Sequence, residues 1–193
     1  MAEYWHITWS THNSRISHRM MDYHVKSGMT LWLGEQEEIF ITETIAETVR
    51  KNGCRIYAYN ICKDHVHMLI QCSGDDIANT IRMMKSKSAW RYREYLDIDP
   101  RVKFDLWSGK FNRWFIKSEE QFNNTVMYII RNRQKHGFPE NKGLPPVILE
   151  MIRGCGNIIH AEEYENEIRY RTEQRVFRTD KGIAIHCRHK ALS

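Results

Sequence analysis

The sequence predicts an α+β domain followed by a C-terminal extension, because strand-like and helix-like patterns alternate along most of the chain. Residues 4–9 alternate polar and apolar side chains, which is typical of a strand with one buried face. Helical spacing of apolar residues begins near residue 35, and Gly53 suits the end of that helix. Two runs rich in β-branched and aromatic residues, 54–62 and 66–72, are joined closely enough to form a hairpin.

Three more elements are expected after the hairpin. Asp75 or Asp76 is a candidate cap for a second helix that runs to about residue 95. Aromatic residues predict a fourth strand over residues 106–116, and Ser118 with Gln121 forms a capping box that starts a third helix. Residues 10–34 lack periodicity, so we expect a long loop there.

Composition narrows the class of protein. A chain of 193 residues suits one main domain. No apolar run is long enough to span a membrane and the first residues do not resemble a signal peptide, so we expect a cytoplasmic protein without a membrane partner. The five cysteines include no CxxC pair, which predicts reduced thiols rather than disulfides or a cysteine zinc site.

The charge is modestly basic and is concentrated at the C-terminal end. The formal net charge is +5, and the last 26 residues carry seven basic side chains against two acidic ones. Two interpretations stay open, a solvated end and a phosphate-binding arm in which Arg175 and Arg178 contact DNA. His186, Cys187 and His189 could also suggest a metal sensor, but no second ligand pair stands at structural-zinc spacing.

Two histidines stand one residue apart at the head of the second hairpin strand, in the stretch KDHVHMLIQC. Side chains alternate along a strand, so His65 and His67 point the same way while Val66 and Met68 point to the core. Paired imidazoles on one face can converge on a metal ion. With ten histidines in the chain, chance also produces such a pair readily, so the motif needs support from elsewhere.

The third helix supplies that support. Tyr128 and Asn132 are four residues apart, which places a phenol and an amide on a common helix face. Lys135 and His136 continue that side before Gly137 ends the helix. A helical tyrosine is more often a core residue with its hydroxyl at the rim, so Tyr128 alone would decide nothing. The second helix offers a basic side that either faces solvent or contacts nucleic acid, made of Arg82, Lys85, Lys87 and Arg91.

The combination of segments resembles a known family over about residues 4–137. The segments YWHITWST, KDHVHMLI, LWSGKF, IKSEEQF and the helix from Tyr128 to Gly137 are similar to those of single-tyrosine HUH transposases, most closely the REP-associated tyrosine transposases. The resemblance implies an antiparallel sheet with helices on one face, like an RRM or ferredoxin-like domain. It implies an HUH domain over residues 1–137, with residues 138–193 as a basic extension that contributes to DNA binding.

The resemblance also implies roles for individual residues. His65, His67 and Asn132 would bind Mg²⁺ or Mn²⁺, and Tyr128 would be the nucleophile. The implied partners are single-stranded DNA hairpins such as REP-like palindromes, bound by a monomer or a homodimer. The chain departs from the family pattern where Arg133 replaces a frequent proline, and where Arg113 and Trp114 replace a frequent acidic and basic pair.

Two functions follow as hypotheses. The leading one is a metal-dependent single-stranded DNA endonuclease and strand transferase that forms a covalent 5′-phosphotyrosine, which conserves bond energy for rejoining. The alternative is a nonenzymatic regulatory module that binds hairpins through aromatic residues on an RRM-like sheet. Such a module would not need His65, His67, Asn132 and Tyr128 together, so the sequence favours the enzyme.

Overall fold

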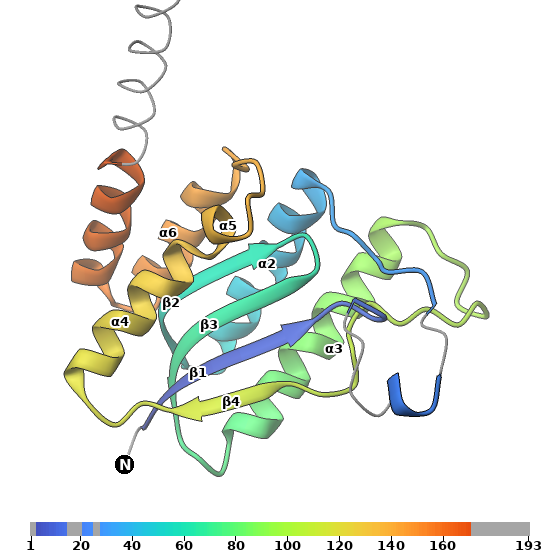
Figure 1. Cartoon of the computed structure of the whole chain (residues 1–193), viewed down its shortest axis with the longest axis horizontal. Helices are drawn as coiled ribbons and strands as arrows, with labels where there is room; N and C mark the ends of the chain where they lie inside the picture. Colours follow the sequence, from blue (N-terminus) through green and yellow to red (C-terminus); the bar gives the residue numbers. More distant parts are fainter. Residues whose placement is uncertain (1–2, 15–20, 25–27, 171–193) are drawn as a thin grey trace, which may run out of the picture.

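A four-stranded antiparallel sheet forms the centre of the protein, whose computed structural model describes residues 3–14, 21–24 and 28–170 (Figure 1). The strand order is β2-β3-β1-β4. The strands span Glu3–Ser10 (β1), Arg55–Cys62 (β2), His65–Cys72 (β3) and Asn112–Phe115 (β4). The N-terminal strand therefore lies inside the sheet, between the second arm of the hairpin and the edge strand β4.

Two long helices cover one face of this sheet. Helices α2 (Glu35–Lys51) and α3 (Ile77–Tyr95) lie behind the strands in Figure 1. They pack on the apolar side chains that alternation directs to this face, among them Ile7 of β1 and Met68 of β3, both fully buried. Asn52 caps α2 and is followed by Gly53 at a φ of +64°, a conformation that favours glycine and ends the helix as predicted.

The other face is crossed by α4 (Glu119–Ile130), which is followed by the short helix α5 (Asn132–Lys135). Buried Val126 and Ile129 attach α4 to the sheet over β2 and β3. Asn60 of β2 donates its Nδ2 hydrogens to the carbonyl oxygens of Ile129 at 2.9 Å and Ile130 at 3.3 Å. These carbonyls lie at the end of the helix, where the regular hydrogen-bond pattern runs out, so Asn60 holds the C-terminus of α4 on the sheet. The long helices α2 and α3 thus lie on one face, as the resemblance implied, and α4 lies on the other.

The first part of the C-terminal extension packs on the main domain. Helix α6 (Leu144–Gly154) packs against α2 and the edge strand β2, and its Ile148 and Met151 belong to the same hydrophobic core as the sheet. A further helix begins at residue 158, with Tyr164 in that core. The predicted boundary after residue 137 stays a prediction, and Arg175, Arg178, His186, Cys187 and His189 lie outside the described residues.

Three local predictions differ from the structure. Asp76 stands at the start of α3 without a side-chain cap, because its backbone is already helical (φ −90°, ψ −20°) and not in the extended conformation that capping needs. β4 is shorter than the predicted strand 106–116. Before it, the carbonyls of Ser108 and Lys110 accept from Nζ of Lys85, the latter at 3.1 Å, and not from a neighbouring strand. The third helix breaks at Arg131 into α4 and α5.

A buried ion pair ties α5 to α2. Glu38 of α2 is 1% exposed and accepts from Nη2 of Arg133, which directly follows Asn132. The Glu38 carboxylate also accepts from the backbone N–H of Lys63 at 2.8 Å and from Nδ2 of Asn141 at 2.9 Å. Arg133 in turn donates to the Pro139 carbonyl at 2.7 Å. This network joins α2, the β2-β3 turn, α5 and the following loop at one point.

Candidate active site

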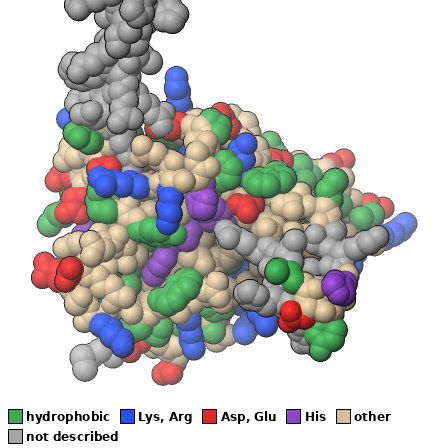
Figure 2. Space-filling view, viewed as in Figure 1, with side chains coloured by type: hydrophobic (Ala, Val, Ile, Leu, Met, Phe, Trp, Pro, Cys, Tyr) green, Lys and Arg blue, Asp and Glu red, His purple; other side chains and the backbone are tan. Residues whose placement is uncertain are grey.

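Strand register brings polar side chains from separate parts of the sequence onto one face of the sheet. His6 of β1 pairs with Trp114 of β4, Thr8 pairs with His67, and Ser10 pairs with His65. Residues directly opposite each other in antiparallel strands share a face, so both predicted histidines lie beside His6 and Trp114. This is the face crossed by α4, and Figure 2 shows histidines gathered near its centre, with hydrophobic and basic side chains next to them.

His65 is held from both sides. Its Nδ1 lies 2.6 Å from Oδ1 of Asp64, and its Nε2 lies 2.8 Å from Oδ1 of Asn132. The carboxylate can only accept when ionised, so Nδ1 carries the hydrogen and Nε2 is directed at the Asn132 oxygen. The structure therefore brings His65 and Asn132 together as predicted, and adds Asp64 as the residue that orients the imidazole.

His67 makes the corresponding contact with a residue that the sequence argument did not select. Its Nδ1 lies 3.0 Å from Nε2 of His6, and the two rings stack with centroids 5.3 Å apart. Burial lowers the pKa of His6 to about 4, so this ring is neutral near pH 7. The polar alternation of β1 was the available signal for His6, because it places residue 6 on the face opposite Ile7.

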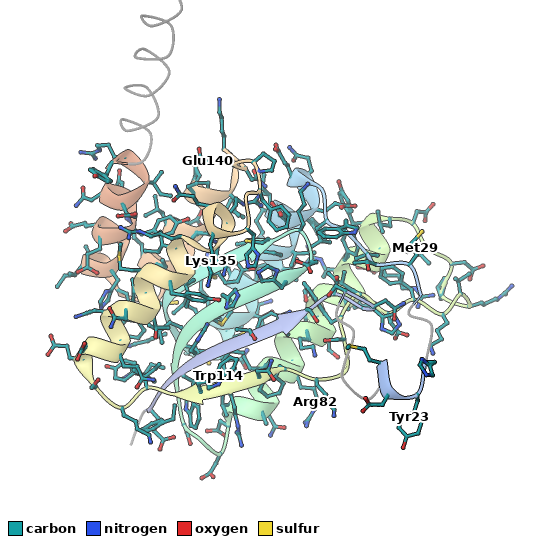
Figure 3. The ribbon with its side chains drawn as sticks, viewed as in Figure 1. Tyr23, Met29, Arg82, Trp114, Lys135 and Glu140 are labelled. Carbon is teal, nitrogen blue, oxygen red and sulfur yellow. The ribbon has the colours of Figure 1, made fainter. Side chains whose placement is uncertain are left out.

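Tyr128 is on the last turn of α4, beside these histidines. Its ring centroid lies 5.3 Å from that of His67 and 5.8 Å from that of His6, and the residue is 37% exposed. Nζ of Lys135, which Figure 3 labels, lies 4.8 Å from the Tyr128 ring centroid, which places a cation next to the phenol. The ring of His136 is centred 5.0 Å from that of His65. Three predicted residues, Tyr128, Asn132 and His136, therefore contact the histidines of β3, and Lys135 contacts Tyr128.

The assembled side chains line an open groove of about 980 Å³. Among the described residues that line it are His67, Tyr128, Trp114 and two lysines, Lys110 and Lys135, but no carboxylate. The surface that faces the groove is therefore aromatic, polar and cationic. Such a surface suits a phosphate-bearing ligand with planar groups rather than an acidic or purely apolar one.

The donor atoms at the head of the groove fit a divalent cation. Among the described residues no three His, Cys, Asp or Glu side chains form a metal-binding group, so a site here needs the amide oxygen of Asn132. Asn132 is fully buried and its Nδ2 has no hydrogen-bond partner in the described part of the chain, so only its oxygen is engaged. Ligands about 2.1 Å from an octahedral ion lie roughly 3 Å apart, close to the observed separation of His65 Nε2 and Asn132 Oδ1.

The basic residues of α3 do not line this groove. Arg82, Lys85, Lys87 and Arg91 belong to the helix behind the sheet, where Figure 3 labels Arg82. Nζ of Lys85 donates to the Ser108 carbonyl at 2.7 Å, and Arg91 lies 3.5 Å from Glu47 of α2. Arg82 donates to Oδ1 of Asn79 at 2.8 Å, so three of the four have partners within the protein, and DNA contact by these residues stays a prediction.

The sequence of the chain matches a protein-family model over residues 3–132, a span that ends on Asn132 and includes the complete histidine strand and Tyr128. The family is described as "Transposase IS200 like". The chain belongs to this transposase family. No curated protein is significantly similar to this chain. Among its described residues, none of the helices combines the length and apolar character needed to cross a membrane.

Two solved structures resemble the transposase weakly. A REP-associated tyrosine transposase bound to a REP hairpin is 18% identical, with a TM-score of 0.49 over 71% of this chain and 70% of that one. A protein of Deinococcus radiodurans R1 provisionally assigned as a transposase is 16% identical, with a TM-score of 0.41 over 72% and 94% of the two chains. These similarities are too low to bear on the site, and membership rests on the family model.

Proposed function

We propose that the transposase is a metal-dependent single-stranded DNA endonuclease and strand transferase that acts through a covalent 5′-phosphotyrosine. The observation that carries the proposal is the convergence of Tyr128 with His65, His67 and Asn132 at one end of a cationic groove. If these residues were purely structural, two features would have no purpose. The Tyr128 phenol is 37% exposed beside two histidines, and the buried Asn132 amide engages only its oxygen.

In the proposed reaction, the phenol oxygen of Tyr128 attacks a DNA phosphate. A bond forms between this oxygen and phosphorus, and the bond from phosphorus to the 3′ oxygen breaks, so the phenol proton ends on the released 3′ hydroxyl. Attack by a 3′ hydroxyl on the phosphotyrosine reverses these changes and joins strands without an external energy source. Lys135 places positive charge against the ring on which the attacking oxygen stands.

Mg²⁺ or Mn²⁺ would be held by Nε2 of His65, by His67 and by Oδ1 of Asn132. A bound ion supplies Lewis-acid stabilisation of the scissile phosphate and orients it toward the phenol. Imidazole suits manganese better than magnesium, whereas the amide oxygen suits both. Asp64 and His6 fix the two ring orientations through the opposite nitrogens, so the chain prepares both imidazoles before a ligand arrives.

The substrate class proposed here is a hairpin-forming single strand, such as a REP-like palindrome. The groove is open along one side, has two lysines and contains exposed aromatic surface, which suits a backbone and unstacked bases. The assembly proposed is a monomer or a homodimer, since each catalytic residue named above comes from one chain.

The decisive experiment mixes the protein with labelled single-stranded hairpin oligonucleotides taken from DNA that flanks its own gene, with Mg²⁺ or Mn²⁺. Wild-type protein should form an adduct that resists denaturation, and Tyr128→Phe should form none. Tyr95→Phe is the matched control, because Tyr95 is 50% exposed at the end of α3 and does not line the groove. An undiminished adduct in Tyr128→Phe would overturn the assignment of the nucleophile.

A second experiment separates the metal site from the binding of DNA. His65→Ala and His67→Ala should lose metal-dependent cleavage and keep hairpin binding, because both side chains are buried beneath the groove surface. Unchanged cleavage in either variant would show that these histidines are structural. Tight binding by wild-type protein with no adduct under either metal would instead favour a regulatory module that binds hairpins without cutting them.

A further inference from the structure

Trp114 is a large aromatic side chain with one face against the active site and nearly half of its surface exposed. It lies in the edge strand β4 opposite His6, and its exposed fraction is 49%. The centroid of its ring is 5.3 Å from that of His6, with the two planes inclined by 32°. Trp114, labelled in Figure 3, also lines the groove that contains Tyr128.

All four residues of β4 are exposed, but its two aromatic side chains have different neighbours. Phe115 points to the opposite face of the sheet, where its ring packs 5.3 Å from that of Trp5. Among the described residues, the aromatic ring that Trp114 contacts is the imidazole of His6 and not an apolar ring. An indole held from one side by an imidazole presents its other surface to whatever occupies the groove.

Distance places this indole next to the chemistry. His6 contacts Trp114 on one side and contacts both His67 and Tyr128 on the other. Trp114 is therefore separated from the nucleophile by one imidazole ring. A strand whose phosphate lies at Tyr128 must lead its adjoining nucleotide along the groove, and on this side the groove wall is the indole of Trp114.

The charges around the groove favour a nucleic-acid occupant. Lys110 and Lys135 line it, and none of the described lining residues is acidic. Cations that accept phosphates and an aromatic surface that accepts bases are the two parts of a single-strand binding groove.

We propose that Trp114 is a stacking platform for the base of the nucleotide that adjoins the phosphate attacked by Tyr128. This inference rests on the proposed function, whose substrate it specifies further. Stacking depends on the aromatic surface of the base and not on its hydrogen-bonding edge, so the subsite accepts any base and contributes affinity rather than sequence selection. Its rigid support by His6 positions the nucleotide beside the nucleophile.

The test measures binding in EDTA, so that no cleavage contributes. Fluorescence anisotropy gives the affinity of the full chain for a short labelled oligo(dT) and for an abasic oligomer of the same length and charge. Trp114→Ala should weaken oligo(dT) binding about five- to hundredfold and leave abasic binding unchanged. Trp114→Phe should keep most of the affinity. Phe115→Ala is the matched control from the same strand and should bind both oligomers as wild type does.

The two oligomers also show whether Trp114→Ala folds, because abasic binding needs an intact cationic groove. Equal losses on both oligomers, or no loss on either, would overturn the stacking role. Failure of wild-type protein to bind either oligomer would overturn both the platform and the proposed nuclease. If Trp114→Ala weakens only oligo(dT) binding but wild-type protein forms no tyrosyl adduct, the stacking role is supported and the proposed chemistry is refuted.

A second measurement tests the position of the subsite. In hairpin substrates with a single abasic site moved along the strand, the defect of Trp114→Ala should disappear only where that site adjoins the cleaved phosphate. A defect that is the same in every substrate would exclude stacking next to the nucleophile.

Discussion

Replacement of Arg133 by methionine should destabilise the protein strongly although Arg133 contacts no residue of the groove surface. The side chain of Glu38 is 1% exposed and that of Arg133 10%, so the substitution leaves a buried carboxylate with only two neutral donors, from Lys63 and Asn141. Breaking one side of a buried ion pair costs about 3–5 kcal/mol. For a domain of this size that corresponds to a fall of roughly 6–20 °C in Tm.

The loss should extend to the metal site. Asn132 precedes Arg133 in the four-residue helix α5, and the Arg133 side chain is what ties this helix to α2. We therefore expect Arg133→Met to lower the affinity for Mn²⁺ as well as the free energy of unfolding. Calorimetric titration with Mn²⁺ at a temperature where the variant is still folded separates the two effects.

Arg131→Met is the matched control for this prediction. Arg131 is adjacent in sequence and pairs with Glu167 at 2.9 Å, but its side chain is 53% exposed. An exposed pair of this kind contributes at most about 1 kcal/mol. If Arg133→Met costs no more than Arg131→Met in urea unfolding, the buried pair is not what anchors α5, and the reasoning is refuted.

Other consequences can be measured independently. His6→Ala should weaken Mn²⁺ binding about 10- to 100-fold, with partial rescue by His6→Gln, because the hydrogen bond to Nδ1 of His67 orients that ring; equal affinity in calorimetry would exclude the role. Asp64→Ala should have a similar effect through His65, and an unchanged Mn²⁺ affinity would contradict it. The lowered pKa of His6, about 4 when folded, means that the unfolded chain binds more protons below pH 6.5. In EDTA, the contribution of His6 to the free energy of unfolding should therefore be complete above pH 6.5 and fall by up to about 3 kcal/mol toward pH 4. If urea unfolding shows no such pH dependence, and His6→Gln does not change it, this prediction is wrong. Ser118→Ala should cost about 1 kcal/mol, because the hydroxyl accepts from the Gln121 N–H at the start of α4; no change in Tm would exclude this cap.

The sequence predicted those parts of the site that depend on short-range periodicity. Alternation placed His65 and His67 on one strand face, and their shared face is confirmed by the register with Ser10 and Thr8. A capping box marked the start of α4, where Ser118 does accept from the Gln121 N–H. These features need only neighbouring residues, so a single sequence contains them.

The missed parts depend on contacts between distant residues. His6 meets His67 across 61 positions, and nothing local specifies which strand pairs with β1. The break at Arg131 arises where Asn60 takes the terminal carbonyls of α4, a contact that spans 69 positions. The pairing of Arg133 with Glu38 spans 95. Tertiary contacts override local propensity at each of these points.

The central position of β1 also determines when the active site can form during synthesis. β1 must pair with β3 on one side and with β4 on the other, and β4 ends at Phe115. Long-range pairings of this kind close slowly, because the intervening chain loses entropy before any contact compensates. In a nascent chain, the histidines therefore lie on an incomplete sheet until β4 and α5 have also been synthesised. The complete constellation forms only once translation has passed Asn132, so truncated translation products that stop earlier should lack the proposed catalytic set.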